Sequence, residues 1–207
     1  MEPSASPPAR LGILGGTFDP IHLGHLVAAS EAMHRFELDR VVLVPAGRPW
    51  QKSEFSDAED RLMMTTLAAA THPRLSVSRI EIDRRGPTYT VDTLEALRAS
   101  FPDAALFFIV GADVAMELKT WHRVDAIASL ATVVAVNRPG SELTGRTTEP
   151  GLPKVEVLEM PALDVSSTEI RRRVATGAPI DYLVPADVAA YIRDRDLYTD
   201  VREARGA

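Results

Sequence analysis

The chain contains no cysteine, few aromatic residues and no long apolar run. The absence of cysteine from its 207 residues excludes disulfides and thiolate chemistry, and it fits a reducing compartment such as the cytoplasm. The longest apolar stretches fall well short of the roughly 18 residues that a membrane-spanning helix needs. The net charge of −6 argues against a general nucleic-acid-binding protein. An acidic chain can still bind a phosphate-rich ligand if its basic residues gather at one site.

The length predicts a single domain. A chain of 207 residues suits one α/β domain better than two, and such a domain buries roughly 70% of the surface of its unfolded chain. The first ten residues are rich in proline and serine and contain no apolar segment like that of a signal peptide. We therefore expect a disordered tail at residues 1–10, one domain over residues 11–198 and a flexible tail at residues 199–207.

Apolar and amphipathic segments alternate along the chain. Six apolar runs predict strands, at residues 11–14, 40–45, 75–82, 104–110, 132–136 and 155–159. The segments between them predict helices, among them one that carries Met116, Leu118 and Trp121. This alternation indicates a Rossmann-like, doubly wound parallel sheet with helices on both faces and a helical C-terminus. Ligands bind such sheets beyond the carboxyl ends of the strands, so the loops that follow the strands share one edge.

The sequence GGTFDPIHLGH at residues 15–25 joins the first predicted strand to the first predicted helix. Gly15 and Gly16 let the backbone turn sharply and approach a ligand closely. His22 and His25 are three residues apart, so a helix that begins between them points both rings the same way. A helix start also presents free N–H groups and a positive dipole to phosphate. The stretch therefore predicts a site for a nucleoside triphosphate.

Other interpretations of this stretch fit it less well. Its glycines lack the G-x-G-x-x-G spacing of the dinucleotide-binding fingerprint, and the sequence has no G-x-x-x-x-G-K-[ST] phosphate loop. Two alternatives stay open: a tight turn in which the histidines are incidental, and a zinc pair. The second lacks cysteines and an obvious third ligand.

The same eleven residues resemble the first motif of bacterial nicotinate-nucleotide adenylyltransferases. Within them, His22-x-Gly24-His25 matches the H-x-G-H signature of the nucleotidylyltransferase superfamily. The resemblance implies transfer of the adenylyl group of ATP to nicotinate mononucleotide, with Mg²⁺ carried by the ATP phosphates. It also implies that His22 and His25 are catalytic. The residues that it assigns to ATP are Gly15, Gly16, Thr17 and Phe18, of which Thr17 also faces the mononucleotide.

A second stretch, VSSTEIR at residues 165–171, resembles the superfamily signature I-S-S-T-x-I-R, with Val165 in place of isoleucine. It is another helix start, with hydroxyls, free amides and Arg171 one turn in, which suits the β- and γ-phosphates. Ser166 and Glu169 taken alone also make a plain capping box. The resemblance assigns a catalytic role to Arg171 and ATP binding to Ser167, Thr168 and Arg171.

Gly111 and Asp113 follow the most apolar of the predicted strands. The resemblance assigns both residues to ATP, with the Asp113 carboxylate on the ribose hydroxyls. The alternative for Asp113 is an N-cap of the next helix.

Thr88, Tyr89 and Trp121 resemble features of the nicotinate branch of the superfamily. The resemblance implies that Trp121 stacks on the pyridine ring while backbone groups near Thr88 meet the pyridine carboxylate. Core packing at helical spacing from Leu118 is the alternative for Trp121. Lys52 resembles a family lysine that faces the mononucleotide phosphate, and a solvated lysine is the alternative there.

Three rival functions share part of this pattern. Pantetheine-phosphate adenylyltransferase has both signatures, but it is usually shorter and lacks the features at Thr88 and Trp121. A nicotinamide-preferring relative differs only in recognising an amide in place of a carboxylate, which the sequence does not decide. A non-catalytic nucleotide sensor has no need of both histidines. The sequence leaves open whether the chain forms a homo-oligomer, and it assigns no role to Trp50, His122 or Arg138.

Overall fold

The computed structural model describes residues 7–47, 56–137 and 151–199. Its centre is a parallel six-stranded sheet in the order β3-β2-β1-β4-β5-β6. The strands are β1 (Arg10–Gly16), β2 (Arg40–Pro45), β3 (Leu75–Val77), β4 (Ala105–Gly111), β5 (Ala131–Val136) and β6 (Val155–Leu158). The strand order reverses between β1 and β4, so the carboxyl ends of these two adjacent strands form the crevice where such sheets bind ligands.

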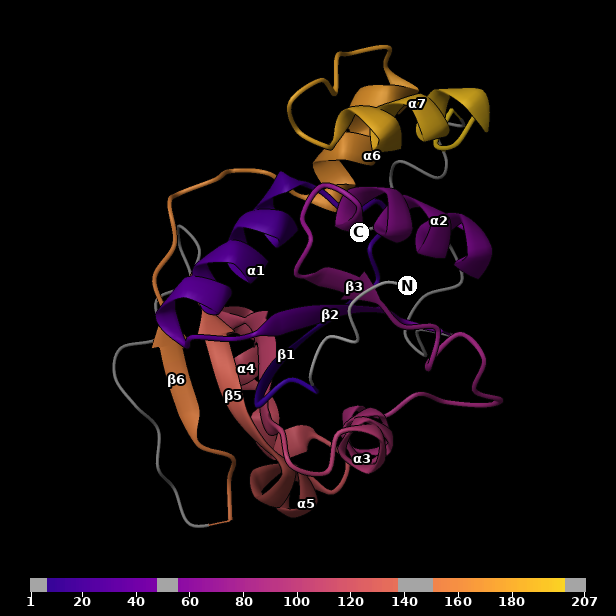
Figure 1. Cartoon of the computed structure of the whole chain (residues 1–207). Helices are drawn as coiled ribbons and strands as arrows, with labels where there is room; N and C mark the ends of the chain where they lie inside the picture. The colour runs from indigo at the N-terminus through magenta and orange to yellow at the C-terminus, as the bar shows by residue number, and fades with distance from the viewer. Residues whose placement is uncertain (1–6, 48–55, 138–150, 200–207) are drawn as a thin grey trace, which may run out of the picture.

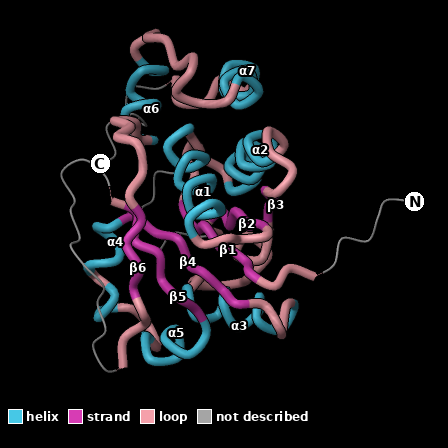
Figure 2. The backbone as a smooth tube through the Cα atoms, turned by 60° about the vertical axis from the view of Figure 1, so that its left-hand side comes forward, coloured by secondary structure: helices cyan, strands magenta, loops and turns pink. Residues whose placement is uncertain are grey.

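Helices cover both faces of this sheet (Figures 1 and 2). They are α1 (Leu23–Arg35), α2 (Ala58–Ala69), α3 (Thr90–Ser100), α4 (Ala112–Met116), α5 (Val124–Leu130), α6 (Ser167–Ala175) and α7 (Ala186–Asp194), with a 3₁₀ helix, η1 (Leu118–Thr120). Helices α1, α2, α6 and α7 pack into one apolar cluster, and α3, α4 and α5 pack into the other. The Rossmann-like fold and the helical C-terminus are confirmed.

The inner strands β1, β2, β4 and β5 are mostly apolar because the two clusters lie on opposite sides of the sheet. Along β1, Ile13 faces the cluster with α3, while Leu14 faces the cluster with α1. Both side chains are buried, as are their neighbours Phe108 and Ile109 on β4. Burial of one such side chain contributes roughly 1.5–3 kcal/mol, so these central strands hold the crevice rigidly.

The edge strand is shorter than the sequence predicts. The predicted strand at residues 75–82 is wrong beyond Val77, where β3 ends. Leu75 and Val77 pack on the cluster with α1, but Ile80 packs on the opposite cluster. The chain therefore leaves the sheet edge and turns, with the N–H of Asp83 donating to the carbonyl of Arg79 at 2.9 Å.

The predicted helix through Met116, Leu118 and Trp121 is broken in the structure. Helix α4 ends at Met116, η1 follows, and Trp121 has extended backbone angles (φ −74°, ψ 144°). Leu118 and Trp121 both pack on the cluster with α3, while Met116 is 60% exposed.

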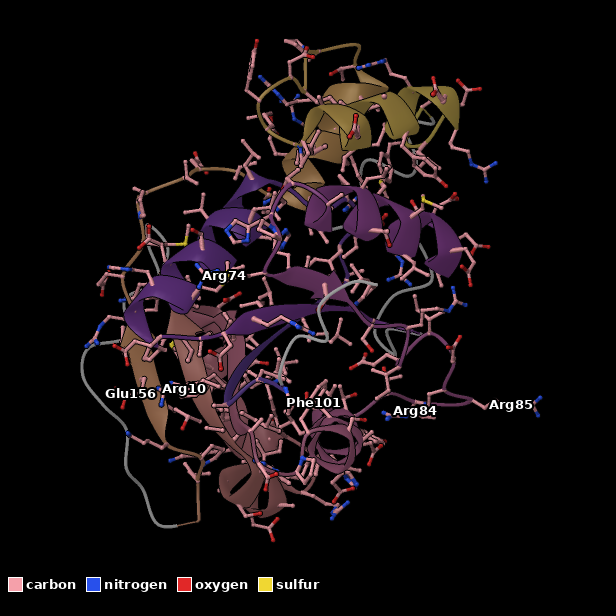
Figure 3. All side chains as sticks on the ribbon, viewed as in Figure 1. Arg10, Arg74, Arg84, Arg85, Phe101 and Glu156 are labelled. Atoms are coloured by element: carbon pink, nitrogen blue, oxygen red, sulfur yellow. The ribbon has the colours of Figure 1, made fainter. Side chains whose placement is uncertain are left out.

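The N-terminal end of the sheet begins earlier than the predicted domain. Arg10, which the sequence assigns to the tail, belongs to β1, and its N–H and that of Ala9 each donate to Asp39 Oδ2 at 2.8 Å. The Arg10 guanidinium, whose residue is labelled in Figure 3, lies 4.7 Å from the centre of the Phe107 ring. Within the described ranges, no helix has both the length and the apolar character to pass through a bilayer.

Candidate active site

His22 and His25, the two histidines predicted to be catalytic, stack on each other at the start of α1. Their ring centroids are 3.7 Å apart with an interplanar angle of 27°. The backbone N–H of His22 donates to Nδ1 of His25 at 3.2 Å, so the proton of a neutral His25 ring is on Nε2. His22 is 2% exposed and His25 is half-buried, with the Phe18 ring edge-on to it. The rings face the same way, as their three-residue spacing predicts.

Close packing around position 24, between the two histidines, favours glycine there. A Cβ atom there would lie 3.1 Å from the His22 ring and 3.1 Å from Val165 Cγ1. These distances are tighter than ordinary van der Waals contact, so a side chain would push the two neighbours away. The missing side chain therefore lets the segment that leads into α6 approach the histidines.

The start of α6 docks on the loop between β1 and α1, which we call the β1–α1 loop (residues 17–22). Ser167 Oγ donates to the carbonyl of Pro20 at 2.8 Å. Arg171 is 5% exposed, and its Nη1 donates to the carbonyl of Asp19 at 2.7 Å. Its Nη2 donates to Thr168 Oγ1 at 3.4 Å. The two signature stretches, far apart in sequence, therefore converge on one loop.

A buried tyrosine near the C-terminus holds the same loop. The Tyr198 hydroxyl donates to Asp19 Oδ1 at 2.7 Å, and the N–H of Ser56 donates to Oδ2 at 3.3 Å. Tyr198 and Asp19 are each 1% exposed. Burial, followed by the Asp19 charge, raises the pKa of Tyr198 well above its ordinary value, so the hydroxyl keeps the proton that it donates. Sequence reasoning missed this contact, because nothing local marks Tyr198 as a partner of Asp19.

We expect Tyr198→Phe to lower the free energy of unfolding by about 1–3 kcal/mol, because a buried carboxylate oxygen loses its donor. Urea denaturation measures the change. The matched control is Tyr182→Phe, since Tyr182 is 90% exposed and should change the stability by less than about 0.5 kcal/mol. Equal stability of the two variants would contradict the role of the Tyr198 hydroxyl.

Gly111 and Asp113 lie at the carboxyl end of β4, beside the end of β1. The N-cap of α4 is Gly111, and Asp113 is the second residue of the helix with an exposed side chain, so the N-cap alternative for Asp113 is wrong. A Cβ atom at Gly111 would collide with Asp113 Oδ1. The carboxylate thus folds back over the strand end, at the same sheet edge as the histidines.

A cavity of about 450 Å³ brings together the residues predicted to bind the pyridine. Its lining residues are Thr88, Tyr89, Thr90, Val114, Glu117, Thr120, Trp121, His122 and Ile127. Trp121 is half-buried and lies edge-on to Phe108 with ring centroids 5.9 Å apart, so it both packs on the core and lines the cavity. The Tyr89 and His122 rings lie 4.4 Å apart. Lys52, Trp50 and Arg138 lie outside the described residues.

Comparison with known proteins identifies the family. Residues 13–173 match the family model described as cytidylyltransferase-like. A probable nicotinate-nucleotide adenylyltransferase of Streptomyces coelicolor is 57% identical and covers 89% of this chain and 98% of its own. A probable nicotinate-nucleotide adenylyltransferase of Saccharopolyspora erythraea is 50% identical. The match covers 95% of this chain and 93% of that protein.

The chain belongs to the nicotinate-nucleotide adenylyltransferase family.

A solved structure of the same enzyme class shares the fold. The Plasmodium falciparum nicotinic acid mononucleotide adenylyltransferase in complex with NaAD is 18% identical, with a TM-score of 0.75 over 92% of this chain and 97% of that one. As a member of that family the protein is an enzyme, a nucleotidyltransferase of NAD biosynthesis. The solved structure shows the same Rossmann-like fold.

A carboxylate that sequence reasoning missed supports the pyridine cavity of this adenylyltransferase. Glu81 Oε1 accepts a hydrogen bond from Thr93 Oγ1 at 2.8 Å, and Arg84 Nη1 donates to the same hydroxyl at 3.3 Å. Burial raises the pKa of Glu81, while the bonds from Thr93 and Thr88 oppose that rise. Glu81 thus links the start of α3 to the segment that carries Thr88.

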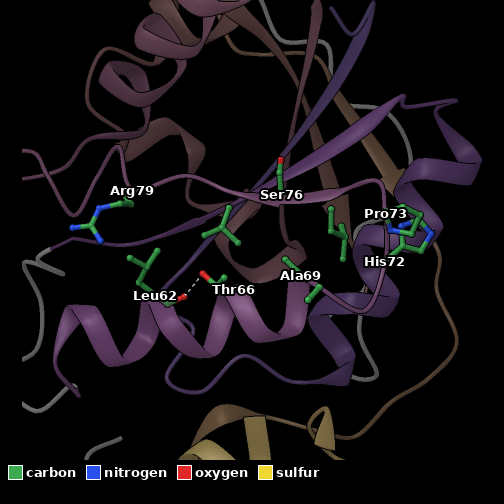
Figure 4. A pocket seen from close by; sticks show the side chains of 10 residues that line it. Leu62, Thr66, Ala69, His72, Pro73, Ser76 and Arg79 are labelled. Carbon is green, nitrogen blue, oxygen red and sulfur yellow. Dashed lines mark hydrogen bonds between the residues drawn. The ribbon is translucent and has the colours of Figure 1, made fainter. Parts of the chain in front are cut away.

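A second hollow, of about 560 Å³, lies between α2 and β3 (Figure 4). Leu62, Thr66, His72 and Arg79 are among its lining residues, and none of the predicted site residues is.

In the described ranges, no group of three or more His, Asp or Glu side chains could hold a metal ion, so no third ligand joins His22 and His25 there.

Proposed function

We propose that His22, His25 and Arg171 carry out adenylyl transfer from ATP to nicotinate mononucleotide. An oxygen of the 5′-phosphate of the mononucleotide attacks the α-phosphorus of ATP, and the bond from that phosphorus to the bridging oxygen breaks. Pyrophosphate leaves with the bonding electrons, and nicotinate adenine dinucleotide forms. The convergence of the stacked histidines and of Arg171 on the β1–α1 loop is the observation that supports these roles.

The nucleophile needs no strong base, because the phosphate of the mononucleotide is already an oxyanion near neutral pH. Catalysis then depends on alignment and on stabilising the charge that develops in the transition state. In our proposal His22 and His25 donate hydrogen bonds to the α-phosphate and the bridging oxygen. Backbone N–H groups near Gly16, Thr17 and Phe18 assist them.

The second signature holds the leaving group. Ser167, Thr168 and Arg171 bind the β- and γ-phosphates in this proposal, since α6 starts beside the β1–α1 loop. Asp113 binds the ribose hydroxyls, and Gly15 and Gly111 let the nucleotide approach the strand ends. Mg²⁺ bound to ATP would be held mostly by phosphate and water, and it would offset the negative charge of the triphosphate.

The 450 Å³ cavity binds the nicotinate ring in this proposal. We expect Trp121→Ala to raise KM for nicotinate mononucleotide about 10-fold, because stacking on an aromatic side chain contributes roughly 1–3 kcal/mol. KM for ATP should change by less than about 2-fold. Trp121→Phe is the matched control, since it keeps a stacking surface. A purely structural Trp121 would instead lower the thermal stability and leave both KM values unchanged.

Pyrophosphate release from ATP distinguishes the candidate acceptors. We expect release with nicotinate mononucleotide, less with nicotinamide mononucleotide and none with phosphopantetheine. Equal rates with the two mononucleotides would reject the acid preference, and no release with any acceptor would indicate a nucleotide sensor.

We also propose that the enzyme works in the cytoplasm, which its lack of cysteine supports; cell fractionation tests that location.

A further inference from the structure

Arg61, in α2, is a buried arginine to which the sequence analysis assigns no role. It is 1% exposed and lies in the buried stripe of α2 with Met64, Thr65 and Ala68. A cation in such a place is costly unless hydrogen bonds satisfy it. Burial lowers the pKa of the guanidinium, and the Asp19 charge opposes that shift.

The guanidinium of Arg61 binds four backbone carbonyls from separate parts of the chain. Its Nη1 donates to the carbonyls of Thr17 at 2.8 Å and Ala46 at 2.7 Å. Its Nη2 donates to Gly47 at 3.1 Å, and its Nε donates to Ser56 at 3.1 Å. Thr17 is the first residue of the β1–α1 loop. Ala46 and Gly47 directly follow β2, and Ser56 precedes α2. One side chain therefore joins the loop of the histidines to the carboxyl end of β2.

The backbone of the β1–α1 loop is held in a conformation that it does not prefer. Phe18 has a φ of 54°, in the left-handed region that non-glycine residues seldom adopt. The carbonyls on either side of it are each gripped by a buried guanidinium, that of Thr17 by Arg61 and that of Asp19 by Arg171. Such a strained residue persists only where its surroundings determine it.

We infer that Arg61 is a positioning residue for adenylyl transfer. By holding Thr17 against the end of β2, it keeps Phe18 in its left-handed conformation. It thereby aims the N–H groups of the loop, His22 at its end and His25 in the first turn of α1 at the α-phosphate. This inference rests on the proposed function of that loop. It assigns Arg61 no contact with substrate.

Lysine is the informative replacement, because it keeps the charge but has neither the planar fork nor enough donors for four carbonyls. The chain also offers a matched control in Arg98 of α3. Its guanidinium likewise donates to backbone carbonyls, those of Pro102, Ala104 and Leu130. These carbonyls precede β4 and β5, at the amino edge of the sheet, opposite the site.

The experiment compares Arg61→Lys with Arg98→Lys in the pyrophosphate-release assay with ATP and nicotinate mononucleotide. We expect Arg61→Lys to lower kcat at least about 10-fold, because small errors in alignment are costly. Both KM values should change less than about 3-fold, since the binding groups remain. Arg98→Lys should keep kcat within about 2-fold of the wild type, although both variants lose thermal stability.

Equal kcat values for the two variants and the wild type would overturn the inference. If Arg61→Lys does not fold, as judged by circular dichroism, Arg61→Gln is measured in its place. Failure of both to fold while Arg98→Lys folds would also overturn it, because Arg61 would then support the whole fold. An error in the proposed histidine roles has a different signature, near-normal turnover of His25→Ala, and leaves this comparison intact.

Discussion

We expect His25→Ala to lower kcat at least about 100-fold. In other enzymes, removal of one preorganised hydrogen-bond donor that stabilises the charge developing in the transition state has an effect of that size. His25 is half-buried, and its Nδ1 accepts a hydrogen bond from the N–H of His22 that alanine cannot replace. Because loss of one such bond costs about 0.5–1.5 kcal/mol, we expect the variant to fold.

His34 on the same helix provides the control for this variant. It lies in the last turn of α1 and is exposed, so His34→Ala removes an identical side chain away from the loop. Pyrophosphate release at saturating ATP and nicotinate mononucleotide measures kcat, and circular dichroism checks that both variants are folded. Turnover of His25→Ala within about 3-fold of His34→Ala would remove His25 from the catalytic machinery.

Arg171→Met is the second variant with a large expected effect. In the proposed mechanism Arg171 supplies charge to the departing pyrophosphate, and in the structure it also holds the carbonyl of Asp19. We expect kcat/KM for ATP to fall at least about 100-fold. The free energy of unfolding should fall by about 1–3 kcal/mol, because the buried carbonyl loses a charged donor.

Arg172 is the matched control for this prediction. It follows directly in α6, is exposed, and pairs with Glu169 at 2.7 Å on the surface. Because exposed pairs contribute little, Arg172→Met should change the stability by less than about 1 kcal/mol and leave kcat/KM within about 2-fold. Arg171→Lys separates the two roles of Arg171, since it keeps the charge but not the planar fork. Near-normal kcat/KM in both Arg171 variants would leave Arg171 with a structural role alone.

The two signature stretches carry most of what the sequence indicates about the site. The spacing of His22 and His25 predicts that the rings face one way, and they stack at the start of α1. The likeness of residues 165–171 to a phosphate-binding signature predicts a shared site, and Arg171 contacts the β1–α1 loop. Both predictions depend on helix starts, which short sequence patterns specify well.

The buried contacts that hold the loop were beyond sequence reasoning. Arg61 gives a weak local signal, since it occupies the apolar stripe of α2 where a cation is unexpected. Tyr198 gives none, because its partner Asp19 lies almost the whole chain away. Which donor meets which carbonyl depends on how α2 and the C-terminal segment pack over the sheet.

By itself the sequence determined the alternation of strands and helices, the positions of the two helix starts and the family, because periodicity and motif spacing are local properties of the chain. Only the tertiary structure decided that β3 ends at Val77, that the helix breaks after Met116 and that two buried guanidinium groups flank Phe18. The end of β3 and the two guanidinium contacts depend on residues that are distant in sequence. Local propensity is too weak to predict them.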